Sequence, residues 1–380
     1  MTKLIEIRGT HRANKGAELM AAAVVDRASE FGAKCAVDLT FGGYEDRQRN
    51  ELLLLLKPYI GGRVGLAQWC LKMMGPERRR AFGAVCQNEV PIVLDASGFA
   101  FGDRWGAERA KQLLDDAQRN KAQGGQFILL PQAYGPFTDR KVSESFRSAC
   151  ELSDMVFVRD KKSREYVEPL VDTSKLVLSP DFTNGLKPKP VEHLGLPAEF
   201  ACIVPNNKMV ENQGESAEAS YVQYLLKCVR AVRDQGLQPV LLLHEQKKDR
   251  RIGELVGSQE KLRMIAPLDA REIKGVIGKS ALLIGSRFHS LVSALSQGIP
   301  CIGTSWSHKY EELFGDYEHI EYLLGDTSAG EIESHVGRLV AESSQVREKL
   351  VRCAADEKEK TVAMWSMVAD RLGWKKDEVV

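Results

Sequence analysis

Residues 281–313 read ALLIGSRFHSLVSALSQGIPCIGTSWSHKYEEL, and this stretch decides the fold class. A fully apolar strand is expected over Ala281–Ile284, and a helix is expected over Phe288–Gln297. A Gly-Ile-Pro turn ends this helix, and a second buried strand is expected over Cys301–Gly303. A buried strand, a helix and another buried strand in this order are typical of parallel α/β sheets.

The same alternation extends through most of the chain. Further strands are expected at 4–7, 35–39, 92–94, 127–130, 155–158, 202–204 and 239–243, and helices at 16–31, 221–234 and 269–278. Consecutive strands with crossover helices between them pair in parallel. The sequence therefore predicts two successive α/β domains with mostly parallel sheets, and a ligand site at the carboxyl ends of strands in the cleft between them.

A change in composition marks the expected domain boundary. Residues 184–200, NGLKPKPVEHLGLPAEF, hold three prolines and have no clear period, which is typical of a linker. We therefore expect an N-terminal domain over 1–186, a linker over 187–198, a C-terminal domain over 199–330 and C-terminal helices over 331–380.

Two polar side chains mark the start of the helix expected after residue 285. Arg287 and His289 lie where free backbone N–H groups and the helix dipole favour an anion. Arginine can bind a carboxylate or phosphate with two parallel hydrogen bonds, and histidine can transfer a proton near neutral pH. His308 and Lys309 follow the next strand, so neighbouring strands would bring them to the same cleft. His308 either orients the Lys309 loop or is a surface histidine.

Composition and charge exclude several classes of protein. The chain has 380 residues, 43% of them hydrophobic, and its formal net charge is +1, so it has no overall basic field for nucleic acid. Its eight cysteines include no CxxC pair, which favours reduced thiols in a cytoplasmic protein. The longest apolar run, Leu19–Val25, is too short to span a membrane. The seven histidines form no recognised metal-ligand spacing, and the turn at 9–16 lacks the glycine pattern of a dinucleotide or P-loop site. We therefore predict no metal and no cofactor.

The segment SRFHSLVSALSQGIPCIG followed by HKYEELF resembles the C-terminal signature of the polysaccharide pyruvyltransferase family. Other fragments agree in order: Asn14 with Gly16, ASGFAFGD at 96–103, LPQAYGPF at 130–137, VRDKKS at 158–163 and SPD at 179–181. The resemblance runs from about residue 8 to about residue 325. It implies two Rossmann-like domains arranged as in GT-B glycosyltransferases.

The resemblance also implies a reaction, in which a pyruvyl group moves from phosphoenolpyruvate to a sugar of a cell-surface polysaccharide or its precursor. The products would be a cyclic pyruvate ketal and phosphate. His289 is the expected general acid, Arg287 and Lys309 the expected ligands of the donor, and Asp103 an expected base for an acceptor hydroxyl. Ser286 and Ser290, which flank the R-x-H residues, are further expected substrate ligands, with Asn14, Gly16, Arg159 and His308. For Arg159, a structural network with Asp160 or Ser163 is an equal alternative.

Other interpretations remain open at this stage. A GT-B-like glycosyltransferase or sugar-nucleotide epimerase would need a nucleotide site, to which Glu311 or Glu312 could contribute. A binding protein that kept the fold and lost the chemistry is a third option. Residues 52–80 mix apolar residues with a basic run, so they either form an amphipathic helix pair on the first domain, with a solvated loop at Arg78–Arg80, or lie on an anionic membrane surface. The protein is expected in the cytoplasm, with peripheral contact at the inner face of the cell membrane as an option, and with a free or lipid-linked sugar as acceptor.

Overall fold

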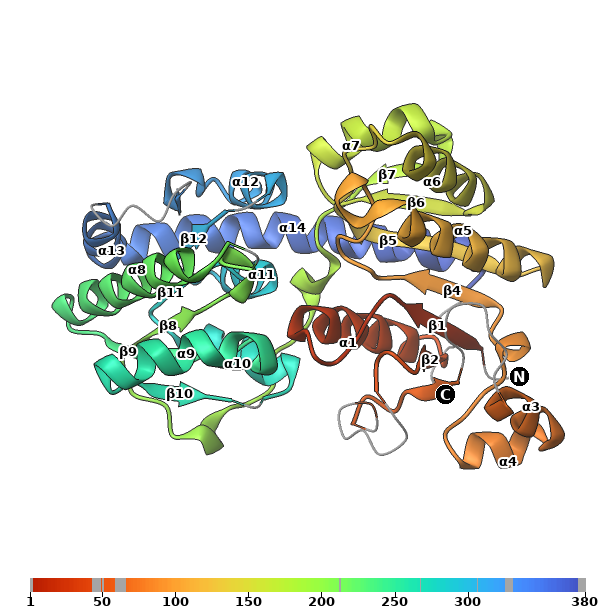
Figure 1. Cartoon of the computed structure of the whole chain (residues 1–380), viewed down its shortest axis with the longest axis horizontal. Helices are drawn as coiled ribbons and strands as arrows, with labels where there is room; N and C mark the ends of the chain where they lie inside the picture. The colour runs from red at the N-terminus through yellow and green to blue at the C-terminus, as the bar shows by residue number, and fades with distance from the viewer. Residues whose placement is uncertain are drawn as a thin grey trace. The chain divides into compact units, whose positions relative to one another are not determined.

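The computed structural model describes residues 3–42, 49, 51–58, 66–211, 213–266, 268–305, 307–324 and 331–374. The chain divides into two compact units. The first comprises residues 1–12, 17–182 and 360–380, and the second comprises residues 13–16 and 183–359. Each unit is an α/β domain with helices packed on a parallel sheet (Figure 1).

In the described part of the first unit, all strands are parallel and follow the order β3-β2-β1-β4-β5-β6-β7. They are β1 (Leu4–Arg8), β2 (Lys34–Asp38), β3 (Leu55–Lys57), β4 (Ile92–Asp95), β5 (Gln126–Gln132), β6 (Met155–Val158) and β7 (Leu176–Leu178). The helices are α1 (Lys15–Ser29), α3 (Leu66–Met73), α4 (Pro76–Ala81), α5 (Gly106–Ala122), α6 (Arg140–Leu152) and α7 (Lys161–Val167). Because the strand order reverses beside β1, the switch point of this sheet lies between β1 and β4.

The second unit repeats this topology, with the parallel order β10-β9-β8-β11-β12-β13 among its described residues. Its strands are β8 (Phe200–Val204), β9 (Gln238–Leu242), β10 (Arg263–Ile265), β11 (Leu282–Gly285), β12 (Cys301–Thr304) and β13 (Leu323–Leu324). Its helices include α8 (Glu215–Asp234), α9 (Gln246–Glu260), α10 (Ala270–Lys279), α11 (Phe288–Leu295), α12 (His308–Asp316) and α13 (Ile332–Ala341). Its switch point lies between β8 and β11.

The predicted fold class, two α/β domains with parallel sheets, is confirmed. Four strands, β3, β7, β10 and β13, were not expected, because two or three residues are too few to show a hydrophobic period. The stretch 52–80 contains strand β3 as well as helices α3 and α4, and its arginine run lies in α4 rather than in a solvated loop. Residues 59–65 of that stretch lie outside the described residues.

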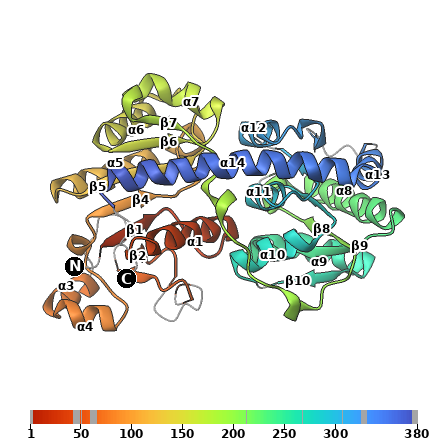
Figure 2. The ribbon, with the colours of Figure 1, turned by 180° about the vertical axis from the view of Figure 1, so that it is seen from behind.

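The division of the chain differs from the expected boundaries in three respects. Residues 13–16, expected in the first domain, belong to the second unit. The main part of that unit begins at Thr183 instead of after the proline-rich linker. The last helix, α14 (Ser343–Arg371), is one continuous helix (Figure 2), yet its residues up to Glu359 belong to the second unit and those from Lys360 to the first. In the first unit the ring of Trp365 packs edge-on against Phe182, with centroids 5.8 Å apart. An apolar face on α14 therefore belongs to the core of the first unit.

Candidate active site

The polar residues of the candidate site in the second unit lie in the segments that follow β8, β9, β11 and β12. In a sheet with this strand order, a ligand crevice forms outside the carboxyl ends of the strands at the switch point. Gly285 ends β11 and pairs with Val204 at the end of β8. A Cβ at Gly285 would lie 2.9 Å from the Cβ of Val204, so glycine allows the two strand ends to approach closely.

Ser286 is the centre of a hydrogen-bond network at this switch point. Its carbonyl accepts hydrogen bonds from Asn206 Nδ2 at 2.7 Å and from the Tyr310 hydroxyl at 2.9 Å. Its hydroxyl lies 3.3 Å from the Tyr221 hydroxyl and is hydrogen-bonded to the Thr304 hydroxyl. Residues from four segments thus hold Ser286, and with it the β11–α11 loop, in one position. Ser286 is 1% exposed, so its hydroxyl is part of this framework.

Arg287 lies at the N-cap of α11 and is 7% exposed. Its guanidinium donates to both carboxylate oxygens of Asp249, from Nε at 3.1 Å and from one terminal nitrogen, and to Glu245 at 2.8 Å. The Asp249 carboxylate also accepts the backbone N–H groups of Glu245 at 2.9 Å and Asn207 at 3.0 Å. Because the described contacts use three of the five N–H bonds of Arg287, they leave two for a bound anion.

His244 precedes these two carboxylates in the chain and is 3% exposed. Its Nδ1 has no hydrogen-bond partner among the described residues. Burial lowers the pKa of His244 well below its ordinary value, and the charges of Arg287 and His289 lower it further. At neutral pH His244 is therefore a neutral imidazole next to two potentially cationic groups.

His289 lies in the first turn of α11, with its ring edge-on to Phe288 at 5.4 Å between centroids. Ser290 donates from its hydroxyl to the Arg287 carbonyl at 2.6 Å, so this side chain closes the first turn of the helix. Gly16, which belongs to the second unit, lies beside His289. A Cβ at Gly16 would lie 2.3 Å from His289 Nδ1, so any larger residue would displace the imidazole. The Gly16 N–H donates to Asn14 Oδ1 at 3.0 Å, which shapes this turn.

Lys309 comes from the first turn of α12 and is 8% exposed. Its ammonium lies 5.0 Å from the centre of the Phe288 ring and 5.3 Å from that of Tyr310, which is within the range of cation–π attraction. The lysine thus lies next to the start of α11. His308 is half-buried at the beginning of the same helix.

Two of the predicted site residues belong to the first unit. Arg159, directly after β6, pairs with Asp181 at 2.9 Å, and both side chains are buried. Asp160 instead accepts the Ser163 N–H at 2.6 Å as the N-cap of α7. In the structure, therefore, Asp181 is the carboxylate that pairs with Arg159. Asp160, the partner considered from the sequence, caps helix α7.

Asp103 holds the turn before α6. Its carboxylate accepts the Thr138 N–H at 2.8 Å, the Thr138 hydroxyl at 2.6 Å and the Asp139 N–H at 3.0 Å. Burial raises the pKa of Asp103, but these hydrogen bonds outweigh it and leave the pKa below its ordinary value. Such a carboxylate is ionised at neutral pH and is a weaker base than a free one.

Sequence reasoning missed the acidic partners of Arg287 and the neutral His244. A signal was present: the strand at 238–242 is followed directly by HEQKKD, residues 244–249, in which Glu245 and Asp249 lie one helical turn apart. Their pairing with a residue 38 or more positions later could not be read from the chain. Asn206, Tyr221 and Tyr310 were missed because each lies far in sequence from Ser286.

A sequence model of the polysaccharide pyruvyl transferase family matches residues 14–308. This chain belongs to the polysaccharide pyruvyl transferase family. The matched region includes the R-x-H segment at 287–289 and every candidate residue of the second unit except Lys309. No curated protein matches this pyruvyl transferase family member in sequence.

Several solved structures with the same fold are named as UDP-N-acetylglucosamine 2-epimerases or contain UDP. One from Listeria monocytogenes, assigned as a UDP-N-acetylglucosamine 2-epimerase, shares 14% identity over 99% of this chain and 97% of its own, with a TM-score of 0.62. UDP-N-acetylglucosamine 2-epimerase from Neisseria meningitidis, bound to its sugar nucleotide, shares 13% identity over 97% of this chain and 100% of its own, with a TM-score of 0.60. Anabaena HepE, in complex with UDP and glucose, shares 10% sequence identity over 98% of this chain and 100% of its own, with a TM-score of 0.58. At these identities the likeness shows the GT-B fold that the family resemblance implied.

Two other kinds of site are absent from the described residues. No group of three or more histidine, cysteine or acidic side chains there has the geometry to hold a metal ion. No helix in the described ranges combines the length and hydropathy needed to cross a bilayer. The eight cysteines are all described, all are unpaired, and seven of them are buried.

Proposed function

We propose that this family member transfers a pyruvyl group from phosphoenolpyruvate to two hydroxyls of a sugar in a cell-surface polysaccharide or its precursor. The observation that carries the proposal is the placement of Arg287, His289 and Lys309 around the start of α11, in the segment that bears the family signature. Phosphoenolpyruvate is a small, highly charged anion, and two cationic side chains at a helix N-terminus suit its carboxylate and phosphate.

The two cations would bind the donor in different ways. Asp249 and Glu245 hold the Arg287 guanidinium rigidly, so its two remaining N–H bonds present a fixed direction to the anion. Lys309, held over two aromatic rings, supplies a point charge. Ser286 and Ser290 would support this site through the backbone of the β11–α11 loop.

The chemistry needs one proton donor and two hydroxyl nucleophiles. A proton from His289 adds to the methylene carbon of the donor, and positive charge develops at C2. One sugar hydroxyl adds to C2 and loses its proton to a base. The C–O bond to phosphate then breaks, the second hydroxyl adds to C2, and its proton neutralises the departing phosphate. The products are the ketal and inorganic phosphate, and His289 regains a proton from the first hydroxyl or from solvent.

For the acceptor side we propose Arg159, Asn14, Gly16 and His308 as substrate contacts and Asp103 as a base. The three hydrogen bonds to Asp103 argue for a structural role as well, and a substitution described below separates the two. The acceptor is a sugar or a lipid-linked saccharide. A lipid-linked acceptor would bring a cytoplasmic enzyme to the inner face of the cell membrane. The proposal includes no cofactor and no metal.

Calorimetric titration with phosphoenolpyruvate tests the donor, with a uridine diphosphate sugar as the parallel ligand. We expect heat with phosphoenolpyruvate alone, and weaker binding in Arg287→Lys because an ammonium cannot replace the fixed guanidinium. Heat with the sugar nucleotide alone would assign the protein to the glycosyltransferase or epimerase class instead.

Phosphate release in the presence of acceptor then tests the general acid. His289→Ala is expected to reduce turnover by about 100-fold or more while donor affinity changes little. His335→Ala is the matched control, since His335 is only partly buried on α13, and its described contacts are a hydrogen bond to the Glu331 carbonyl and an edge-on ring contact with Tyr322. Equal losses of affinity and turnover in His289→Ala would make His289 an anion ligand instead of an acid.

A further inference from the structure

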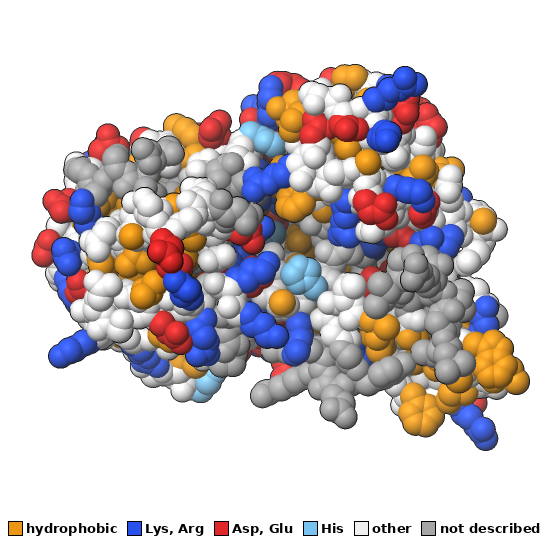
Figure 3. All heavy atoms as spheres, in the orientation of Figure 1, with side chains coloured by type: hydrophobic (Ala, Val, Ile, Leu, Met, Phe, Trp, Pro, Cys, Tyr) orange, Lys and Arg blue, Asp and Glu red, His pale blue; other side chains and the backbone are white. Residues whose placement is uncertain are grey.

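The first unit carries an exposed apolar surface that its core does not explain. Leu53, Trp69, Met73 and Phe82 are 83%, 60%, 74% and 67% exposed. In Figure 3, hydrophobic side chains gather over the region of α3 and α4. Large exposed apolar side chains that cluster in this way mark an interaction site, whereas isolated ones do not. We call these four residues the apolar patch.

The patch is built on a rigid support. Arg79 is buried in α4 and donates to the carbonyls of Leu71, at 3.0 Å, and Met74. It also pairs with Glu89 at 3.0 Å. This arginine therefore fastens α3 to α4. Trp69 and Met73 lie one turn apart on α3, so they share a face of that helix.

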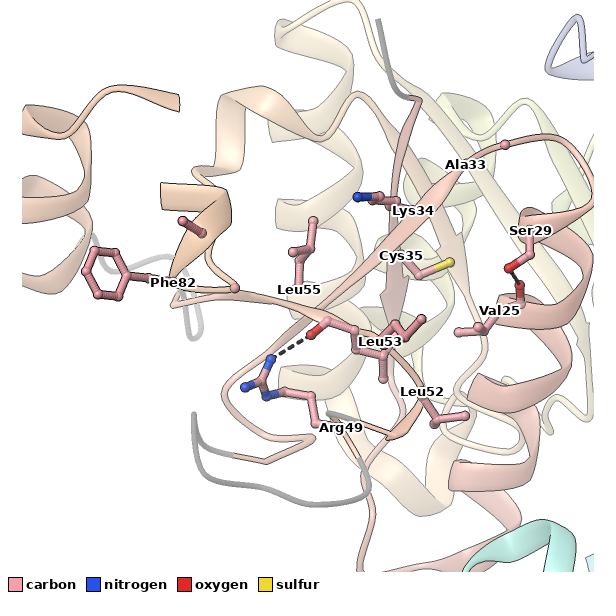
Figure 4. Close-up of a pocket in the computed structure, with 14 residues that line it drawn as sticks. Val25, Ser29, Ala33, Lys34, Cys35, Arg49, Leu52, Leu53, Leu55 and Phe82 are labelled. Atoms are coloured by element: carbon pink, nitrogen blue, oxygen red, sulfur yellow. Dashed lines mark hydrogen bonds between the residues drawn. The ribbon is translucent and has the colours of Figure 1, made fainter. Parts of the chain in front are cut away.

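A hollow continues the patch along the edge of the sheet. It has a volume of about 790 Å³ and is lined mainly by apolar side chains, among them Val25, Cys35, Leu52, Leu53, Leu55 and Phe82 (Figure 4). Lys34, the first residue of β2, also lines it and is exposed. The hollow therefore lies at the amino ends of the strands, whereas Arg8 and Asp95 end β1 and β4 at the opposite edge.

The charged side chains beside the patch are mostly cationic. Residues 66–83 contain four cations and a single acidic residue, Glu77. Lys72, Arg78 and Arg80 are exposed and form no salt bridge with any described residue. An apolar face bordered by unneutralised cations matches the surface of an anionic bilayer, where aromatic side chains enter the headgroup region and cations meet lipid phosphates.

We infer that the apolar patch, with Lys72, Arg78 and Arg80, is the surface by which this protein binds an anionic lipid membrane. The inference deepens the proposed function, because a lipid-linked acceptor would lie at such a membrane, and in that respect it rests on the proposed function. The surface itself is defined by its residues and not by the reaction. Membrane binding would place the side chains of Trp69, Met73 and Phe82 in the headgroup region of the bilayer. The three cations would strengthen the binding through their attraction to lipid phosphates.

The test is sedimentation with vesicles that hold neither phosphoenolpyruvate nor sugar. The purified chain is expected to bind vesicles of phosphatidylcholine and phosphatidylglycerol, to bind phosphatidylcholine alone much more weakly, and to be released by high salt. Trp69→Ser with Phe82→Ser should abolish binding. Arg78→Ser with Arg80→Ser should weaken it by about tenfold or more, from roughly 1 kcal/mol per cation near an anionic surface.

Matched variants keep the test specific. Ile320→Ser with Val362→Ser removes two side chains that are 51% and 59% exposed elsewhere, and Lys187→Ser with Lys227→Ser removes two other exposed cations. Both should bind vesicles like the unmodified chain. All the substituted residues are exposed, so circular dichroism should show intact folding.

Absence of vesicle binding by the unmodified chain overturns the inference, as do equal losses in patch and control variants. A shift from dimer to monomer in the patch variant, without an effect on vesicles, would assign the patch to a second copy of the chain and also overturn it. Since no substrate is present, each of these results leaves pyruvyl transfer to a soluble sugar untouched. Loss of the proposed reaction would likewise leave the vesicle result standing.

Discussion

The two units share one strand order but fill their switch points differently. In the first unit, Arg8 at the end of β1 pairs in register with Asp95 at the end of β4, and their side chains form a buried ion pair. Gln132 donates to Asp95 at 3.0 Å and completes the cluster. In the second unit, the corresponding strand ends are Val204 and Gly285, which carry no charge. The strand-end charges of the first switch point therefore pair with each other, although a hollow of about 350 Å³ lies beside Arg8.

In the second unit, the polar groups near the switch point lie in the loops directly after the strands and not at the last strand residues. Ser286 is held there by four buried partners. The described contacts of Arg287 leave two of its N–H donors for a ligand, and His244 Nδ1 has no hydrogen-bond partner among the described residues. A ligand can use those donors, whereas at the first switch point the charges satisfy one another. The comparison teaches that topology places a crevice, and that the residues just past the strand ends decide whether it can take a ligand.

The largest expected effect comes from removing the central carboxylate in each unit. Asp95→Ala and Asp249→Ala should each lower the free energy of unfolding by about 3–5 kcal/mol, because both carboxylates are fully buried and each loss leaves a buried arginine with one described carboxylate partner in place of two, Asp116 for Arg8 and Glu245 for Arg287. Only Asp249→Ala should also weaken phosphoenolpyruvate binding. Denaturant unfolding and calorimetry measure the two effects.

Asp115→Ala serves as the control for both, since Asp115 is half-exposed and its ion pair among the described residues is with the exposed Lys111. Its loss should cost less than about 0.5 kcal/mol. If Asp95→Ala impaired donor binding as much as Asp249→Ala, the distinction between the two switch points would be lost.

A second prediction concerns acid, because six of the seven histidines belong to the second unit. Burial lowers the pKa of His319 to about 4. The hydrogen bond to the Cys301 carbonyl, at 2.9 Å, raises this pKa but offsets only part of the effect of burial. The unfolded chain takes up this proton near pH 6.5 and the folded chain only near pH 4. Stability is therefore complete above pH 6.5 and falls between pH 6.5 and 4, by about 3 kcal/mol for this group.

Hydrogen exchange followed against pH measures this loss within each unit. We expect protection in the second unit to fall first, and His319→Gln to remove part of the pH dependence. His335→Gln, at a partly exposed site, should leave the profile unchanged. An earlier loss of protection in the first unit would contradict the assignment.

The smallest expected effect separates the two roles of Asp103. As the acceptor of three hydrogen bonds in a partly exposed turn, it should contribute about 1 kcal/mol to stability, which Asp103→Ala would remove. Turnover in that variant distinguishes the roles. A fall of about 100-fold would establish Asp103 as the base, and an unchanged value would restrict it to the turn.

Much of the fold could be predicted from the sequence because its determinants are local. Strands are recognised from buried apolar runs such as Met155–Val158, and helices from their amphipathic spacing. Both patterns can be read from a window of about ten residues, and their alternation indicates parallel α/β units. The R-x-H segment at 287–289 was recognised for the same reason, since strand, loop and helix start are contiguous there. Short strands such as β13 escaped prediction because their pairing partners define them.

What the tertiary structure decided is the state of the charged groups. The sequence shows Arg287 at a helix start, but only the fold brings Asp249 and Glu245 to it from 38 and 42 residues away. The sequence shows three consecutive arginines at 78–80, but only the packing of α3 on α4 buries Arg79 and leaves its two neighbours exposed. Charges act through distance and burial, and neither quantity is a local property of a chain. Strand and helix patterns are local, which is why the sequence alone determined the architecture and the tertiary structure determined the chemistry.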